Sequence, residues 1–134
     1  MAAALSDAAR ALLDSNSFPT VATIQPDGRP QLSVIWAKTD GDDVLFSTKE
    51  GRQKHRNLVR DPRVTLLVTE PDNAYRYLEI RGTATLDTKG GDELINELSL
   101  KYHDVPYTND QPGDVRVVVR ISADRIVEHN LSGS

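Results

Sequence analysis

The sequence predicts a mostly β domain with three short helices, in which six strands form an antiparallel barrel. Three observations carry this prediction. Runs rich in β-branched residues alternate with turns, two of those turns are tight, and a length of 134 residues suits one domain, residues 1–134. Consecutive strands joined by short turns pair antiparallel, so a barrel is favoured over a parallel sheet with crossover helices.

A short helix is expected at residues 6–13. Ser6 is suited to cap its first turn, and apolar residues recur behind it at helical spacing. A polar stretch at residues 14–17 ends the helix ahead of Pro19. The helix therefore precedes the series of strands and does not interrupt it.

Three strands come next. The first, residues 20–25, is joined to the second, residues 30–39, by a Pro-Asp-Gly-Arg turn in which proline fixes one φ and glycine accepts a positive one. A turn at residues 40–42 leads to the third strand, residues 44–48. In the second strand, alternation places Leu32, Val34 and Trp36 on one face and Ser33 and Ile35 on the other.

The second half of the chain is expected to contain two helices and three strands. The segment at residues 49–60 is polar and ends before Pro62, which predicts a short helix. The remaining elements are strands at residues 63–70 and 75–86, a helix at 90–103 with a stripe of Leu94, Ile95, Leu98 and Tyr102, a loop at 105–113, and a strand at 114–127.

Composition excludes several classes of function. The absence of cysteine excludes disulfide frameworks, thiolate zinc sites and cysteine nucleophiles. The histidines at positions 55, 103 and 129 lie in different predicted elements, so no metal site is expected. A net charge of −4 argues against nucleic acid or a membrane surface as partner. The lack of cysteine leaves the compartment open, with the reducing cytoplasm as the default expectation. Residues 1–5 are too short an apolar run for a signal peptide or a membrane span.

Basic residues gather in one segment, residues 49–63. It holds six basic and two acidic side chains, a local charge of +4 in a chain of net −4. Such a cluster suits a small anionic ligand or forms a solvated helix face. Arg52 and Lys54 lie beside the expected start of a helix, whose free N–H groups favour phosphate. Arg60 and Arg63 are expected to be surface or salt-bridge residues.

Two stretches resemble a known family. Residues 54–68, KHRNLVRDPRVTLLV, resemble the phosphate-binding helix and following strand of the pyridoxamine 5′-phosphate oxidase-like, split-barrel flavoproteins. Residues 27–33, DGRPQLS, resemble a hairpin of the actinobacterial branch, which uses the deazaflavin coenzyme F-420 instead of flavin mononucleotide (FMN). The order of elements matches this family over residues 5–127.

The resemblance implies a six-stranded split β-barrel of the FMN-binding type, forming a homodimer whose two chains share each cofactor site. It implies that Arg52 and Lys54 hold the cofactor phosphate, with Ser47 and Thr48 nearby. The strand beside the cofactor ring would contribute Gln31, Ser33, Val34, Ile35 and Trp36. Further contacts are implied for Arg56 and Asn57, and Tyr75 and Tyr77 fall where the partner subunit closes the pocket in similar proteins.

Two departures from the vitamin-synthesising branch set the expected activity. The sequence stops at Ser134 without the C-terminal Arg/His segment that grips pyridoxamine phosphate, and the Arg-x-Lys spacing of Arg52 and Lys54 resembles the deazaflavin branch. We therefore expect an oxidoreductase that moves hydride between reduced coenzyme F-420 and an electron-poor small molecule, such as a quinone, an unsaturated lactone or a nitro compound. An FMN-dependent reductase or oxidase and a non-catalytic cofactor carrier are the alternatives, and no catalytic residue is assigned.

Three aromatic residues in different predicted elements each receive an interpretation. Trp36 is the only tryptophan, and its alternation with Leu32 and Val34 favours packing in the core or a dimer over stacking on a ring. Tyr107, in a loop flanked by prolines, is interpreted as a lid residue. Tyr102 fits the apolar stripe of its helix and is expected to pack.

Overall fold

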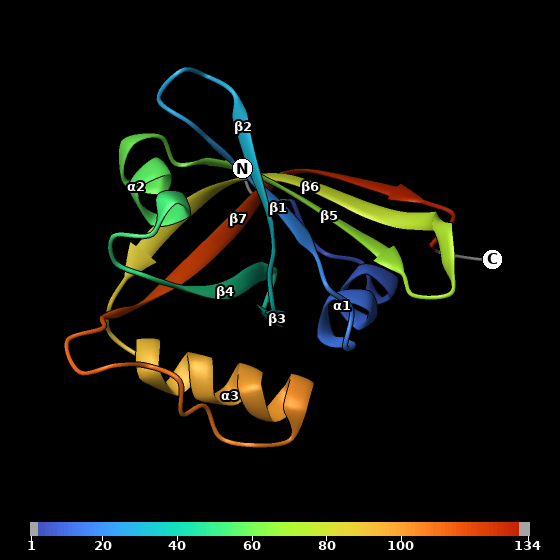
Figure 1. Ribbon diagram of the computed structural model, residues 1–134. Helices are drawn as coiled ribbons and strands as arrows, with labels where there is room; N and C mark the ends of the chain where they lie inside the picture. Colours follow the sequence, from blue (N-terminus) through green and yellow to red (C-terminus); the bar gives the residue numbers. More distant parts are fainter. Residues whose placement is uncertain (1–2, 132–134) are drawn as a thin grey trace.

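One antiparallel sheet carries the fold (Figure 1). The computed structural model describes residues 3–131 and contains, over that range, seven strands and three helices. Their bounds are α1 (Asp7–Asp14), β1 (Thr20–Ile24), β2 (Pro30–Val34), β3 (Ala37–Asp40), β4 (Asp43–Lys49), α2 (Gln53–Arg60), β5 (Arg63–Glu70), β6 (Asn73–Asp87), α3 (Gly91–His103) and β7 (Arg116–His129). The mostly β architecture with short helices is confirmed.

The order of the strands explains why the barrel is split. They lie in the order β2-β1-β5-β6-β7-β4-β3, so the two edge strands are consecutive in the chain. Only Ile35 and Trp36 separate β2 from β3, which brings the two edges of the curved sheet to one corner. The sheet thus forms an open barrel with its split at β2 and β3.

The count of six strands was wrong by one, because the expected strand at residues 30–39 is two strands. Its backbone leaves the sheet at Ile35, whose N–H donates to the carbonyl of Pro19 at 2.9 Å. Ile35 is buried in the core, whereas Leu32 and Val34 are 63% and 64% exposed. The bend also separates Trp36 from the face of Leu32 and Val34, because Trp36 packs with the cluster under α3.

Alternation along the strands fills the barrel with apolar side chains. Its interior is lined by residues at most 1% exposed, among them Val21, Val44, Phe46, Leu66, Leu78, Ile80, Val119 and Ile121. Helix α1 adds Ala9, Leu12 and Leu13 to the same core. Dense apolar packing of this kind gives the site a rigid support.

Helix α3 packs on the other face of β4 and β7. Leu94 and Leu98 contact Leu45 there. The helix starts at Gly91, where a Cβ atom would lie 2.4 Å from the carbonyl oxygen of Arg116. Only glycine permits this approach. The start of α3 is therefore fixed directly against the start of β7.

The basic segment expected as one helix is divided between a strand and a helix. Lys49 is the last residue of β4, because its pairing with β7 continues to Arg116. Gly51 adopts a φ of +88° in the turn that follows, and α2 begins only at Gln53. Strand β7 likewise begins at Arg116, two residues later than expected, and continues to His129.

Some expectations concern residues 1–2 and 132–134, which lie outside the described residues. These are the first part of the N-terminal apolar run and the C-terminal end of the sequence. Among residues 3–131, no helix combines the length and the apolar character needed to cross a membrane.

Candidate functional site

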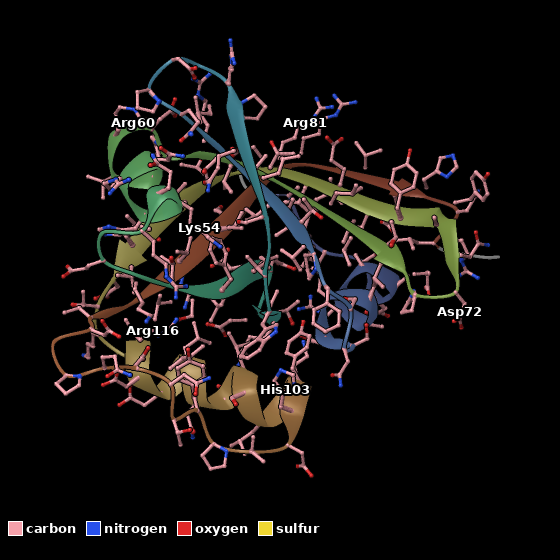
Figure 2. The ribbon with its side chains drawn as sticks, in the orientation of Figure 1. Lys54, Arg60, Asp72, Arg81, His103 and Arg116 are labelled. Carbon is pink, nitrogen blue, oxygen red and sulfur yellow. The ribbon has the colours of Figure 1, made fainter. Side chains whose placement is uncertain are left out.

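A pocket of about 180 Å³ lies where α2, α3 and the split of the barrel meet. Its lining comes from the β2–β3 bend, the end of β4, the start of α2, one face of α3 and the loop before β7: Val34, Ile35, Trp36, Ser47, Arg52, Lys54, Ile95, Leu98, Tyr107 and Arg116. Figure 2 shows Lys54 beneath α2 and Arg116 near the start of α3. The pocket thus joins elements that are far apart in sequence.

Two cations line one side of the pocket, and among residues 3–131 neither has an acidic partner. We call Arg52 and Lys54 the cationic end. Arg52 is exposed and precedes the first turn of α2. Lys54 is partly buried, with its Nζ 5.8 Å from the centre of the Phe46 ring. Burial, and secondarily the charge of Arg52, lowers the pKa of Lys54. An anion bound here would relieve this unfavourable arrangement.

The backbone at the start of α2 adds to this positive field. The first amides of a helix have no intrahelical acceptor and carry partial positive charge. The preceding turn is held by two side chains of the helix itself: His55 Nδ1 accepts from the N–H of Gly51 at 3.2 Å, and Arg56 Nη1 donates to its carbonyl at 2.9 Å. Amides and two cations together suit a phosphate group.

The other cations beside the pocket are fully paired. Arg116 is 4% exposed and donates from two nitrogens to the two carboxylate oxygens of Asp110, each at 2.9 Å. Lys49 Nζ lies 2.9 Å from Asp114 and 3.4 Å from Asp110. We call these four residues the loop clamp. Arg116 lowers the pKa of Asp110, and the hydrogen bond to Asp114 raises the pKa of Lys49. The clamp ties the loop before β7 to the barrel.

The clamp also fixes Tyr107 at the pocket. Arg116 Nη2 donates to the Tyr107 hydroxyl oxygen at 2.8 Å, and its guanidinium carbon lies 4.8 Å from the centre of the ring. Arg116 Nη1 donates to Ser47 Oγ at 3.3 Å. Because the tyrosine oxygen accepts from arginine, its own proton can be donated to another group. Tyr107 thus lies in the pocket wall in a fixed orientation.

Asn57 joins α2 to the first hairpin and does not reach the pocket. It is completely buried, and its side-chain nitrogen donates to Thr23 Oγ1 at 3.0 Å and to Gln25 Oε1 at 2.9 Å. Its oxygen accepts from Gln53 Nε2 at 2.8 Å. Gln31 Oε1 accepts from Thr23 in the same network. Gln31 and Asn57 therefore position the strand and the helix that flank the pocket.

Two buried hydroxyls near the pocket lack a hydrogen-bond partner among the described residues, Ser33 Oγ on β2 and Thr48 Oγ1 on β4. A buried hydroxyl without a partner is costly, and a polar ligand group or a water molecule would satisfy it. Neither hydroxyl lines the pocket, so the two unpaired cations carry the case for a ligand, and they fit one that has a phosphate group.

The structure brings together six of the thirteen residues proposed from sequence: Val34, Ile35, Trp36, Ser47, Arg52 and Lys54. Five more lie on flanking elements without lining the pocket: Gln31, Ser33, Thr48, Arg56 and Asn57. Tyr75 and Tyr77 lie at the far end of β6, where Tyr75 is 78% exposed and Tyr77 stacks on His129 at 4.8 Å. Within one chain, these tyrosines do not contribute to the pocket.

Sequence reasoning missed part of the lining. Ile95 and Leu98 were assigned only to a helix stripe, and Arg116 was not singled out. Arg116 did carry a signal, since it is the one charge within a run of valines at residues 115–119. A charged residue in a strand expected to be buried needs a partner, and acidic residues precede it at positions 110 and 114.

Sequence comparisons give the context of this site. The family model described as pyridoxamine 5′-phosphate oxidase matches residues 5–130. A pyridoxine/pyridoxamine 5′-phosphate oxidase from Kineococcus radiotolerans is 35% identical over 79 residues, which are 59% of this chain and 35% of the relative. The chain thus matches about a third of the length of that enzyme.

Solved structures agree with the sequence comparisons. An F-420 reductase is 32% identical, with a TM-score of 0.80, and the match covers 92% of this chain and 98% of the reductase. A conserved hypothetical protein from Mycobacterium tuberculosis is 31% identical, with a TM-score of 0.77, over 93% of this chain and 84% of its own. A pyridoxamine 5′-phosphate oxidase-like protein from Listeria innocua, at 21% identity and a TM-score of 0.70, shares the fold.

Proposed function

The chain belongs to the pyridoxamine 5′-phosphate oxidase family, and from this premise we propose that it is a reductase dependent on coenzyme F-420. It moves hydride between the reduced deazaflavin and an electron-poor small molecule such as a quinone, an unsaturated lactone or a nitro compound. The observation that carries the proposal is the cationic end, two unpaired cations at a helix start in a pocket that also includes the β2–β3 bend.

The cationic end holds the phosphate of the cofactor. Arg52 offers a planar pair of donors, and Lys54 adds a mobile charge that burial has already desolvated. The strand that precedes Trp36 runs beside the ring, where its backbone meets the polar edge. The bound deazaflavin would supply the hydride chemistry, and the protein binds it, orients one ring face and excludes water.

Two observations distinguish the candidate cofactors. Coenzyme F-420 is favoured by the F-420 reductase, which is matched at 32% identity over 98% of its chain. FMN is the second candidate, because the curated relative is a pyridoxine/pyridoxamine 5′-phosphate oxidase. A carrier that binds cofactor without turnover is the third, since no described side chain is assigned as proton donor.

A homodimer in the cytoplasm completes the proposal. Leu32, Val34 and Leu67 are 63%, 64% and 43% exposed on one face of the sheet, where Thr20 pairs with both Val34 and Leu67. Val34 also lines the pocket, so a second chain on this face would adjoin it. The pocket of about 180 Å³ is smaller than the roughly 300–1,000 Å³ of typical ligand sites, as expected if a partner completes it with Tyr75 and Tyr77.

Calorimetric titration of the purified protein with coenzyme F-420 and with FMN tests the cofactor. We expect F-420 to bind at least about tenfold more tightly than FMN. Tighter binding of FMN would favour the second candidate, and binding of neither would overturn both. Rapid mixing with reduced F-420 and menadione then separates an enzyme, which oxidises the cofactor, from a carrier, which does not.

Sedimentation of two variants tests the dimer. Leu67→Glu places a charge on the proposed interface and should give a monomer. Leu100→Glu is the matched control, because Leu100 is 44% exposed on α3, away from that face, and should remain dimeric. A wild-type monomer, or a dimer that Leu67→Glu leaves intact, would contradict this interface.

A further inference from the structure

A second hollow, of about 390 Å³, lies between α1 and the hairpin of β5 and β6. Figure 1 shows both of these elements away from α2. We call it the hairpin groove. Its lining combines apolar residues of α1 and of the β5–β6 turn with two charged residues of the hairpin: Ala8, Ala11, Leu12, Pro71, Glu70 and Arg76. No residue lines both this groove and the pocket of the cationic end.

The size and the apolar side of the hairpin groove suit a small organic ligand. Ala11 and Leu12 lie three and four residues after Ala8, so the three side chains share one side of α1. The short side chains of alanine leave room beside the helix. The volume lies within the roughly 300–1,000 Å³ of typical ligand sites. The groove can therefore hold an apolar group against α1.

Two opposite charges border this apolar side, and both are partly buried. Alternation along β6 places Arg76 on the same face as Leu78 and Ile80, which are completely buried in the core. Glu70 is partly buried at the end of β5 and lines the same groove. Charged residues on the core side of a sheet are usually paired, so their partners need to be identified.

Neither charge has an ion-pair partner within residues 3–131. Arg76 Nη2 donates to the carbonyl of Leu131 at 3.2 Å, but Arg76 Nε is buried and has no hydrogen-bond acceptor in that part of the chain. A buried donor without an acceptor is costly, and a ligand that supplies an acceptor would remove this cost.

The other charged residues of α1 and the hairpin do not neutralise this pair. Arg10 pairs with Asp42, and Asp14 accepts from Thr39. Asp7 is exposed at the start of α1, and Asp72 is exposed in the β5–β6 turn. The hairpin groove thus presents one positive and one negative group, both available to a ligand.

We propose that the hairpin groove binds a free α-amino acid with an apolar side chain. Arg76 binds the carboxylate, for which its planar guanidinium offers paired donors, and Glu70 binds the ammonium group. The side chain of the ligand packs on the apolar side of α1. A zwitterion satisfies both charges, whereas a simple anion leaves Glu70 unpaired and a simple cation leaves Arg76 unpaired. The site lies outside the proposed cofactor pocket and does not rest on the reductase function.

Calorimetric titration with L-leucine and two analogues tests the assignment of each charge. Leucinamide lacks the carboxylate, and isocaproate lacks the ammonium group. Wild type should bind leucine at least about tenfold more tightly than either analogue, the loss of one charge-assisted bond. Arg76→Met should bind leucine and leucinamide alike and still prefer leucine to isocaproate. Glu70→Gln should bind leucine and isocaproate alike and still prefer leucine to leucinamide.

Two exposed residues provide matched controls. Asp72→Asn removes a carboxylate from the same hairpin, whose tip Figure 2 labels, and Lys89→Met removes a cation from the turn before α3. Both variants should bind leucine as wild type does. If Arg76→Met is unstable, Arg76→Lys keeps the charge and should keep a reduced preference for leucine over leucinamide.

Three results would overturn the inference. These are no binding of leucine to wild type, equal binding of leucine by wild type and both groove variants, and isocaproate binding as tight as that of leucine. The last result would make the groove a simple carboxylate site. A failure of F-420 to bind would overturn the proposed cofactor and leave the leucine titrations unaffected, since the two sites share no residue.

Discussion

Lys49 and Lys54 come from one basic run in the sequence, and the structure gives them opposite surroundings. Lys49 ends β4 beside Asp114 and Asp110, and the hydrogen bond to Asp114 raises its pKa. Lys54 lies in the first turn of α2 with no acidic partner in the described chain, and burial lowers its pKa. The loop clamp and the cationic end thus adjoin the same pocket. The cations of the loop clamp are paired with carboxylates, whereas those of the cationic end are not.

The difference shows which cations are structural and which are available to a ligand. Strand pairing carries Lys49 to Arg116 and so to the acidic loop, whereas the turn at Gly51 directs the chain away from those carboxylates before α2 begins. An unpaired cation that burial disfavours lowers stability unless an anion binds. We interpret the cationic end as a site whose stabilisation comes from its ligand.

The largest effect is expected from breaking the loop clamp. Asp110→Asn removes the carboxylate that pairs with Arg116, whose side chain is 3% exposed. Leaving a buried guanidinium without its counter-charge should lower the free energy of unfolding by about 3 kcal/mol. Urea denaturation followed by tryptophan fluorescence measures this.

The control for that experiment is an exposed ion pair. Asp61 pairs with Arg63, whose side chain is 73% exposed. Arg63 lowers the pKa of Asp61 to about 2, yet water screens a pair at this exposure. Asp61→Asn should therefore change the urea midpoint much less than Asp110→Asn. Equal effects of the two substitutions would mean that the clamp is no stronger than a surface pair.

A smaller effect on thermal stability is expected from removing the charge of Lys49 or of Lys54, and the two substitutions should act in opposite directions. At neutral pH, Lys49→Met loses a favourable pair, because a raised pKa stabilises the folded state below the ordinary value of 10.5. Lys54→Met removes a cation whose charged form is disfavoured, so it should raise the melting temperature without ligand. Thermal unfolding of both variants in phosphate-free buffer checks the signs, and a fall in both would contradict the comparison.

The smallest effect is a pH dependence of cofactor affinity. A bound phosphate raises the pKa of Lys54 from its lowered value, so binding takes up a proton once the free lysine begins to titrate. Affinity should be constant near neutral pH and fall as pH rises toward 10.5. Titrations from about pH 7 to about pH 10 on wild type and Lys54→Arg test this, because arginine remains charged throughout. An equal fall in both proteins would place the titrating group elsewhere.

Much of the fold followed from local pattern. Alternation and tight turns predicted nearly every strand, and Pro62 marked the end of α2 correctly. The bend at Ile35 was missed because it depends on a hydrogen bond to Pro19, a contact that no local pattern encodes. The extension of β4 to Lys49 depends likewise on pairing with β7, which overrides the polar composition of that segment.

Site residues could be predicted from sequence where they all lie in one local element. Arg52 and Lys54 follow from a basic helix start, and the structure places both in the pocket. Asn57 could not be separated from a ligand contact by sequence, because its role depends on partners from another hairpin. Arg116 and Tyr107 are brought to the pocket by the loop clamp, in which Lys49 pairs with two acidic residues more than sixty positions away. Such long-range pairing has no signature within either segment.

The dissociation constant of coenzyme F-420 for Lys54→Ala and Lys49→Ala, measured side by side by calorimetry, tests the central claim most directly. Loss of a charge-assisted bond of roughly 1.5–3 kcal/mol should weaken binding to Lys54→Ala at least about tenfold, and Lys49→Ala should bind within about twofold of wild type. Equal binding by both variants and wild type, or a larger loss in Lys49→Ala, would contradict the assignment of the phosphate to the cationic end.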